Sequence, residues 1–384
     1  MSAEEAVNID GGVLEGGGQL LRIAVGLSAL LSKPISIDNI RANRTPPGLK
    51  YQHAAGLRLV ANICSAQLSG NDTGSSSIQF HPQTPPQTSE SRPYSADPGT
   101  AGSIALLLQV SLPCLIFSPP TAGPSTLHLR GGTNATHSPQ VDYMEHVFLP
   151  FIQKHFGLEP SLRVVKRGYY PKGGGEVHVS VPPVTGPLPA VTLIERGEIR
   201  RVYGRSYVAG LPKSLADTMR AAAIDILVES GIKQNRIKIE SLREKPSDAV
   251  GSGSGIVIWA ETYEGCVIGG SALGKKGMDA SKVGQEAARE LVNNLTHEGC
   301  VDEYMQDQMI IFLALAQGRS KVKTGPLTLH TRTAIWVIEQ LSSAKFHIEE
   351  TEHGAIIECE GIGYVLPPHD LALPPTSSSG NTSS

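Results

Sequence analysis

Three basic side chains stand close together in the segment RANRTPPGLK, which holds no acidic residue: Arg41, Arg44 and Lys50. The planar guanidinium group of arginine binds phosphate oxygens through paired hydrogen bonds, and Pro46 and Pro47 stiffen the loop that presents it. The segment therefore predicts an anion-binding patch, and the alternative is a solvated basic loop. The same two interpretations apply to the basic residues of KRGYYPKGGGEV, which are Lys166, Arg167 and Lys172.

One of the 12 histidines, His330, stands in a position where a ring nitrogen could act as a nucleophile. The segment TGPLTLHT reads as a strand that ends just before a helix, TAIWVIEQL, so the ring is expected near a helix amino terminus. The positive end of the helix dipole favours the neutral imidazole and can hold a phosphate close by. The alternative is a structural histidine.

Tyr304, Asp307 and Gln308 stand at positions i, i+3 and i+4 of DEYMQDQMIIFLAL, so they project from one face of a predicted helix. Such a face could stack a base on the tyrosine, hold a metal or hydroxyl groups through the aspartate, and bind a base or ribose through the amide. The alternative is a polar stripe opposite the apolar one.

Glycine-rich segments offer a second kind of anion site. EGGGQ, residues 15–19, precedes a helix, so its backbone N–H groups could face an anion, although a tight turn explains it equally well. GSGSG, residues 251–255, leads into a strand, where a dinucleotide-binding loop requires a helix. The chain holds no G-x-x-x-x-G-K-[ST] segment, which excludes a standard P-loop.

The elements that must position these residues follow a β, α, β, β, α order, and the glycine triplets at 16–18 and 173–175 hint at a duplicated unit. In the first half of the chain, we expect strands at 6–9, 35–40, 77–81, 125–130, 162–166 and 176–181. We expect helices directly after EGGGQ, at 51–65, at 101–113, and at 139–156 with Ser138 opening it.

A proline-rich crossing at 181–189 and a glycine-rich segment at 269–277 bracket a separate small unit. It is predicted to hold strands at 202–208, 237–242, 256–261 and 266–269 around a helix at 213–230. We therefore divide the chain into a large domain, residues 1–185 plus 285–370, and an inserted small α/β domain, residues 186–284. The Ser/Thr/Pro-rich segment 84–93 and the tail, residues 371–384, are expected to be disordered.

Composition limits the class of protein. The net charge of −3 over 384 residues excludes a strongly basic nucleic-acid binder, so any phosphate-binding surface must be local. The 41 glycines and 27 prolines argue against coiled coils and helical solenoids. Five scattered cysteines without a C-x-x-C pair argue against a disulfide framework or a zinc site. Without a secretory signal or an apolar run of about 20 residues, the chain is expected to be soluble and intracellular, with no membrane partner.

The segment RGYYPKGGGEV resembles the signature of the RNA 3'-terminal phosphate cyclase family, R-G-x-x-P-x-G-G-G-x-[LIV]. Over about residues 7–365, further segments resemble that family in its own order: DGGVLEGGGQLLR, RANRTPPGLKYQH, GTAGSIALLLQ, RGGTNA with SPQVDY, VDEYMQDQ and TGPLTLHTRTAI. The resemblance implies an α/β fold in two domains. The large one has three repeated β-α-β-α-β-β-like units related to enolpyruvyl transferases, and the small insert is thioredoxin-like.

The resemblance also implies an enzyme that uses ATP and a divalent metal, Mg or Mn, to convert an RNA 3'-phosphate end to a 2',3'-cyclic phosphodiester. His330 matches the family's adenylylated histidine, and Glu15 matches its carboxylate for the metal. The matching positions of the ATP pocket are Gln109, Pro139, Tyr304, Asp307 and Gln308. The candidates for the RNA terminal phosphate are Arg22, Arg41, Arg44 and Gln52.

Two other functions share this fold. One is a cyclase-like factor for ribosome biogenesis without cyclase chemistry, whose branch lacks the nucleophilic histidine that this chain retains at His330. The other is an enolpyruvyl transferase, which the RGYYPKGGGEV segment argues against. The resemblance favours the nucleus over the cytoplasm, and the sequence indicates no obligate protein partner.

Overall fold

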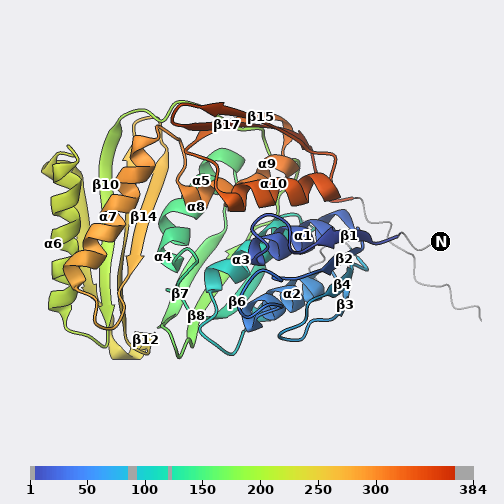
Figure 1. Ribbon diagram of the computed structural model, residues 1–384, viewed down its shortest axis with the longest axis horizontal. Helices are drawn as coiled ribbons and strands as arrows, with labels where there is room; N and C mark the ends of the chain where they lie inside the picture. Colours follow the sequence, from blue (N-terminus) through green and yellow to red (C-terminus); the bar gives the residue numbers. More distant parts are fainter. Residues whose placement is uncertain (1–4, 85–92, 120–122, 368–384) are drawn as a thin grey trace, which may run out of the picture.

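The computed structural model describes residues 5–84, 93–119 and 123–367, so most of the segment 84–93 and the whole tail 371–384 lie outside the described residues. Figure 1 shows a mixed α/β molecule with a large part that holds both the first and the last elements of the chain and a smaller part built around α6 and α7. The predicted α/β fold class is confirmed.

The large part repeats one unit three times. The first copy has the order β-α-β-α-β-β: β1 Val7–Asp10, α1 Gly18–Leu31, β2 Ile35–Asp38, α2 Tyr51–Ile63, β3 Gln67–Ser69 and β4 Ile78–His81. Its sheet has the order β1-β2-β4-β3, in which β1 and β2 are parallel and the other two pairs are antiparallel.

The second and third copies keep this topology. The second contains β5 Tyr94–Ala96, α3 Ile104–Ile116, β6 Ser125–Gly131, α4 Val141–Tyr143, the π-turn η2 Met144–Phe148, α5 Leu149–Phe156, β7 Ser161–Gly168 and β8 Gly175–Val181. The third contains β9 Thr192–Leu193, α8 Glu303–Gln308, α9 Ile310–Leu315, β15 Gln317–Thr324, α10 Leu329–Leu341, β16 Lys345–Thr351 and β17 Gly354–Ile362. Their sheets, β5-β6-β8-β7 and β9-β15-β17-β16, pair as the first one does. The glycine triplets hinted at a duplicated unit, and the family resemblance implied three repeated β-α-β-α-β-β-like units.

The small unit is inserted between β9 and α8. It comprises β10 Ile199–Ala209, α6 Lys213–Glu229, the short turn η3 Gln234–Arg236, β11 Ile237–Arg243, the short turn η4 Pro246–Asp248, β12 Ala249–Val250, β13 Gly253–Thr262, β14 Val267–Leu273 and α7 Ala280–Thr296. Its sheet has the order β11-β10-β13-β14, and β12 adds to the edge of the second repeat's sheet beside β7. The division of the chain at residues 185 and 285 remains a prediction. The small sheet and its helices run from residue 199 to residue 296, because α7 packs on α6 and β14.

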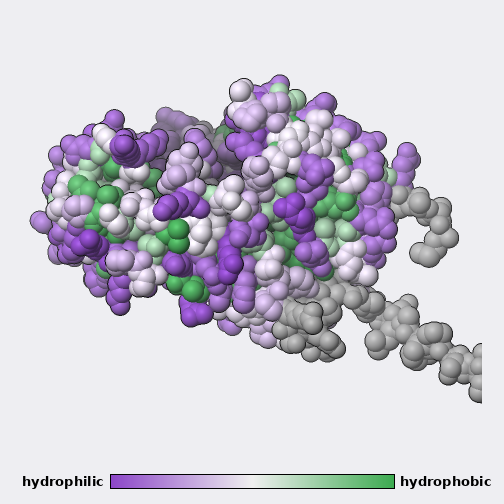
Figure 2. Space-filling view, turned by 90° about the horizontal axis from the view of Figure 1, so that it is seen from below, coloured by the Kyte–Doolittle hydropathy of each residue, from purple (hydrophilic) through white to green (hydrophobic). Residues whose placement is uncertain are grey.

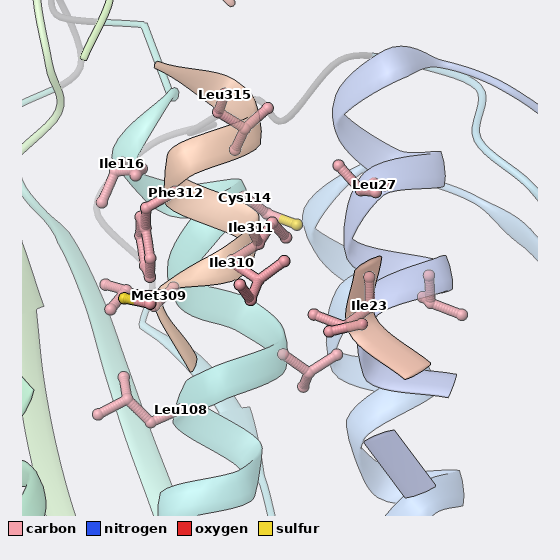
Figure 3. Packing of buried hydrophobic residues seen from close by; sticks show 14 of the residues in the cluster. Ile23, Leu27, Leu108, Cys114, Ile116, Met309, Ile310, Ile311, Phe312 and Leu315 are labelled. Carbon is pink, nitrogen blue, oxygen red and sulfur yellow. The ribbon is translucent and has the colours of Figure 1, made fainter. Parts of the chain in front are cut away.

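The three repeats enclose one continuous hydrophobic core. Figure 3 shows its centre, where Ile23 and Leu27 of α1 lie on one side of α9 and Leu108 and Cys114 of α3 on the other. Burying side chains of this size stabilises the fold by roughly 1.5–3 kcal/mol each. On the face in Figure 2, polar residues predominate and hydrophobic residues are scattered among them. Packing in the core fixes the central helices and, with them, the positions of their amino ends.

Four local predictions are wrong. TGPLTLHT is not a strand: β15 ends at Thr324, and α10 begins at Leu329 because the Thr328 hydroxyl caps it. Helix α1 begins inside EGGGQ at Gly18, and α3 continues through Pro113 to Ile116. The helix expected from 139 is preceded by Gln140, and Ser138 does not cap it. The sequence reading also missed α7, whose apolar residues are mostly alanine and valine.

Candidate active site

The amino ends of four helices meet at one cleft of about 680 Å³. Gly17 and Gly18 line it at the start of α1, Lys50 at the start of α2, Leu106 in the first turn of α3 and His330 in the first turn of α10. The first N–H groups of a helix have no partner within the helix, and they carry a partial positive charge. Gly17 supplies no side-chain cap to α1, which leaves its first N–H groups to bind a ligand. The cleft is therefore built to hold anions.

Glu15 lies between the glycine-rich turn and α10. Its backbone N–H donates to the Thr333 hydroxyl at 3.3 Å, and its Oε1 accepts a hydrogen bond of 2.7 Å from Arg44. Its Oε2 lies 3.7 Å from Nδ1 of His330 and has no hydrogen-bond partner among the described residues. The Glu15 carboxylate therefore accepts a hydrogen bond from Arg44 through one oxygen and faces the His330 ring with the other.

The His330 ring stands at the mouth of the cleft, with 54% of its side chain exposed. Partial burial lowers its pKa below the ordinary value, and the Arg22 and Arg44 cations act in the same direction while Glu15 opposes them. The ring is therefore neutral near pH 7. Since Nδ1 faces Glu15, Nε2 on the other edge of the ring is free to act as a nucleophile.

Two of the cations that line the cleft, Arg22 and Arg41, carry buried donors. Arg22 donates to Gln19 Oε1, and Arg41 is only 6% exposed. Arg22 Nε and Arg41 Nη1 are buried atoms without a hydrogen-bond partner in the described chain. Buried polar groups are rarely left unpaired, and such groups at a cleft await a ligand. Their donors fit the oxygens of a phosphate group.

The loop that carries Arg41 is held in an unusual backbone conformation. Arg41 has φ = 54°, in the left-handed region that side chains other than glycine rarely adopt. This turn directs its side chain inward, whereas Arg44, three residues on, is exposed and pairs with Glu15. The two arginines of the predicted anion patch therefore differ. Arg41 has a donor that faces inward and is unpaired among the described residues, whereas Arg44 already has an acidic partner.

Gln52 and its neighbour in sequence complete the α2 side of the cleft. The Gln52 side-chain oxygen accepts a hydrogen bond of 2.7 Å from the Ser103 backbone, which ties the starts of α2 and α3 together. His53 also lines the cleft, and the sequence reading missed it. In the sequence, only its position directly after Gln52 in RANRTPPGLKYQH marked it as a candidate site residue. Asn43, Thr45, Thr136 and His137 are further lining residues that were not foreseen.

Gln109 and Gln308 line a small neighbouring pocket. Gln19 and Arg22 line both this pocket and the cleft, so they lie between the two spaces. The Gln308 amide donates to the Tyr304 backbone oxygen at 2.6 Å, and its Oε1 is buried without a partner in the part of the chain that the structure describes. Asp307 is buried close by. Burial raises its pKa to about 7, although the Arg22 cation opposes this shift. The carboxyl therefore changes charge near neutral pH.

Tyr304 and Pro139, like Asp307, line neither of these spaces. Tyr304 packs edge to face on Tyr143, with ring centroids 5.8 Å apart. Pro139 is buried just before α4, and it lines neither pocket. The structure thus brings together Glu15, Arg22, Arg41, Arg44, Gln52 and His330, places Gln109, Asp307 and Gln308 next to them, and leaves Pro139 and Tyr304 outside.

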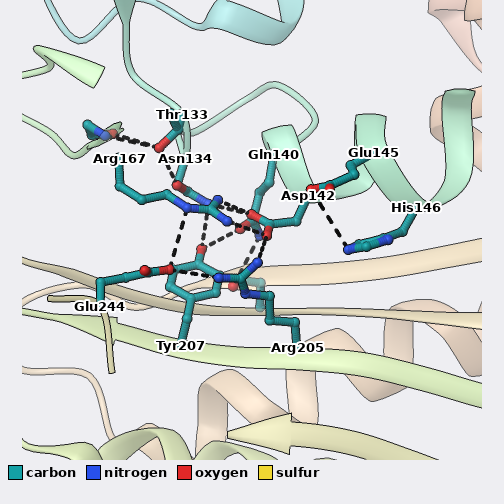
Figure 4. A network of polar contacts seen from close by, with 12 residues as sticks. Thr133, Asn134, Gln140, Asp142, Glu145, His146, Arg167, Arg205, Tyr207 and Glu244 are labelled. Atoms are coloured by element: carbon teal, nitrogen blue, oxygen red, sulfur yellow. Dashed lines mark hydrogen bonds and ion pairs between the residues drawn. The ribbon is translucent and has the colours of Figure 1, made fainter. Parts of the chain in front are cut away.

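The basic segment KRGYYPKGGGEV does not reach this cleft. Figure 4 shows Arg167 turned inward to Asp142, with one bond of 2.8 Å from Nη2 to Oδ1. Both side chains are almost fully buried, and Arg205 and Glu244 of the small unit join the network. The interpretation of Arg167 as part of an anion patch is therefore wrong, because the residue joins the two parts of the molecule.

The residues present suit a divalent metal only in combination with a phosphate ligand. No group of three or more His, Cys, Asp or Glu side chains arranged for a metal occurs within residues 5–84, 93–119 and 123–367. Magnesium, however, is often held by one or two carboxylates together with the phosphates of a substrate. The unpartnered Oε2 of Glu15 is one such oxygen, so the donor set fits a metal that arrives with a nucleotide.

Comparisons with known proteins identify the family of the chain. A family model described as RNA 3'-terminal phosphate cyclase matches residues 13–348. The chain is 41% identical to a probable RNA 3'-terminal phosphate cyclase of Dictyostelium discoideum, over 94% of this chain and 84% of that protein. It is 41% identical to the RNA 3'-terminal phosphate cyclase of Drosophila melanogaster, over 95% of this chain and 99% of that protein. None of the helices in the described part of the chain is long and apolar enough to cross a membrane. The chain belongs to the RNA 3'-terminal phosphate cyclase family.

Proposed function

We propose that this protein is an enzyme that converts an RNA 3'-phosphate end to a 2',3'-cyclic phosphodiester, with ATP consumed and AMP and pyrophosphate released. The observation that carries the proposal is the neutral His330 ring at a cleft where four helix amino ends and two unpaired arginine donors converge. A nucleophile beside an anion site is the combination that nucleotidyl transfer requires.

In the first step, Nε2 of His330 attacks the α-phosphorus of ATP. An N–P bond forms, and the P–O bond to pyrophosphate breaks. The ring gains positive charge as this bond forms, and Glu15 Oε2, 3.7 Å from Nδ1, stabilises that charge.

In the second step, an oxygen of the RNA 3'-phosphate attacks the same phosphorus and displaces the histidine, which gives an RNA end joined to AMP. Arg22, Arg41, Arg44 and Gln52 are the proposed partners of that terminal phosphate. In the third step, O2' of the ribose attacks the 3'-phosphorus, loses its proton to solvent or a basic group, and expels AMP. Holding the phosphate in line supplies much of the rate enhancement for such a transfer.

The nucleotide itself is proposed to lie between α3 and α8. Gln109 and Gln308 present side-chain amides to this region, and Asp307 lies beside Arg22. Tyr304 and Pro139 are proposed as outer contacts of the base, which requires the ligand to extend beyond the neighbouring pocket. A divalent metal bound by Glu15 and the ATP phosphates would supply neutralising charge for the pyrophosphate. A nuclear location is proposed from the resemblance alone.

The test is a product analysis with a labelled RNA that ends in a 3'-phosphate. With ATP and Mg²⁺, the protein should make an end that resists phosphatase, and omission of ATP should leave a phosphatase-sensitive end. A protein that leaves the RNA unchanged under all these conditions would contradict the proposal and favour a non-catalytic role in ribosome biogenesis.

A further inference from the structure

His53 is a cleft residue with a fixed ring tautomer. Its Nδ1 accepts a hydrogen bond of 3.2 Å from the backbone N–H of Lys50, as part of the capping box that opens α2. An accepting Nδ1 carries no proton, so the proton of the neutral ring is on Nε2.

The Nε2 edge of this ring points to the place where α1 begins. A Cβ atom added to Gly18 would lie 2.5 Å from His53 Nε2 and 3.1 Å from Arg22 Nη1. The ring nitrogen, the first residue of α1 and the guanidinium group therefore share one corner of the cleft. Within residues 5–84, 93–119 and 123–367, Nε2 makes no hydrogen bond.

The ring stays uncharged in this corner. Burial, together with the nearby cations Arg22, Arg41 and Lys50, lowers the pKa of His53 to about 3. A neutral N–H donor among three cations can orient an oxyanion without adding charge to it. This matters where the anion must itself act as a nucleophile, because each added positive charge makes its oxygen less reactive.

We propose that His53 donates its Nε2 proton to a non-bridging oxygen of the RNA 3'-terminal phosphate, and so helps to select phosphate-ended RNA. This inference rests on the proposed function. ATP also carries phosphates, but His53 lies with Gln52 on the α2 side of Arg22, whereas Gln109 and Gln308 lie on the other side. The terminal phosphate of RNA is therefore its partner.

The test compares two substitutions of equal length. Both His53→Gln and His53→Glu keep an oxygen for the Lys50 N–H, so both preserve the capping box and should melt within a few degrees of wild type. Only the glutamine side chain also offers an N–H donor. The measurement is the dissociation constant for one labelled RNA with a 3'-phosphate or a 3'-hydroxyl end, and for ATP.

We expect His53→Glu to weaken binding of the 3'-phosphate RNA at least tenfold and binding of the 3'-hydroxyl RNA by less than twofold. His53→Gln should retain most of the preference for the phosphate end. A His53→Glu protein that keeps the full preference, or that loses ATP affinity instead, overturns the inference and leaves His53 as a helix cap. If wild type itself shows no preference for the phosphate end, the proposed function fails before His53 is tested.

Discussion

The two arginines of the RANR segment have different roles at the scale of single residues. Arg41 is buried with an unpaired donor, and Arg44 is exposed and paired with Glu15. A hydrogen bond to a charged group contributes about 1.5–3 kcal/mol. Arg41→Gln should therefore weaken binding of 3'-phosphate RNA by roughly 10- to 100-fold, and Arg44→Gln by less.

The control for this measurement is Arg130→Gln. Arg130 is 60% exposed, pairs with Glu176 and does not line the cleft. Its replacement should leave the affinity unchanged in the same binding assay. Equal losses for Arg41 and Arg130 would show that the protein binds RNA through a general positive surface.

The pH dependence of the first step follows from His330. Its pKa lies below the ordinary value of 6.5, and only the neutral ring can attack phosphorus. The single-turnover rate of protein adenylylation should therefore be constant above about pH 6.5 and fall in more acid solution, as the ring gains its proton. A rate that reaches half of its maximum above pH 6.5 would contradict a lowered pKa.

At the scale of secondary-structure elements, the position of His330 depends on how α10 begins. The Thr328 hydroxyl accepts a hydrogen bond of 3.1 Å from the Thr331 N–H, and this cap fixes the first turn. Thr328→Ala should cost about 0.5–2 kcal/mol in the free energy of unfolding, and it should slow adenylylation several-fold because the turn that carries His330 loosens. Thr328→Ser should restore both. Loss of stability with an unchanged rate would show that the cap does not position the histidine.

The sequence predicted elements well where their residues repeat with a clear period. Helix α6 was expected at 213–230 and forms at Lys213–Glu229, and the start of α2 was correct. The start of α10 was not, because Leu327 and the threonines around it are typical of strands, and only the cap shows that a helix begins there. Local propensity cannot reveal where a side-chain hydrogen bond will form.

The residues of the candidate site could be named from the sequence, but their arrangement in space could not be predicted from it. The resemblance supplied Glu15, Arg41 and His330, which lie far apart in the sequence and together in the cleft. His53 was missed because a single histidine in a helix has no periodic signal. Arg167 was misread because its partner Asp142 comes from another element, 25 residues earlier. Such pairings become visible only when the chain is folded.

At the scale of the whole molecule, the buried network in Figure 4 joins the large part to the insert. Asp142 is fully buried and depends on Arg167 and Arg205 for compensation of its charge. Breaking a buried ion pair costs about 3–5 kcal/mol, because one charge is left without its partner. Arg167→Met should therefore lower the free energy of unfolding by about that amount in a denaturant titration.

Adding Asp142→Asn to the same protein should cost less than the sum of the two single changes, since the stranded charge is then removed. Arg200→Met is the matched control: its pair with Glu261 is at the surface, with Arg200 55% exposed, so the change should leave the free energy of unfolding almost unaltered. Equal effects for Arg167 and Arg200 would show that the network does not hold the two parts together.

Intact-protein mass spectrometry shows directly whether His330 forms a covalent bond to AMP. Wild type incubated with ATP and Mg²⁺ should gain the mass of one adenylyl group, and acid should remove it. His330→Ala should gain nothing while it retains the melting temperature of wild type. Covalent AMP on the His330→Ala protein, or none on wild type that cyclises RNA, would contradict the account.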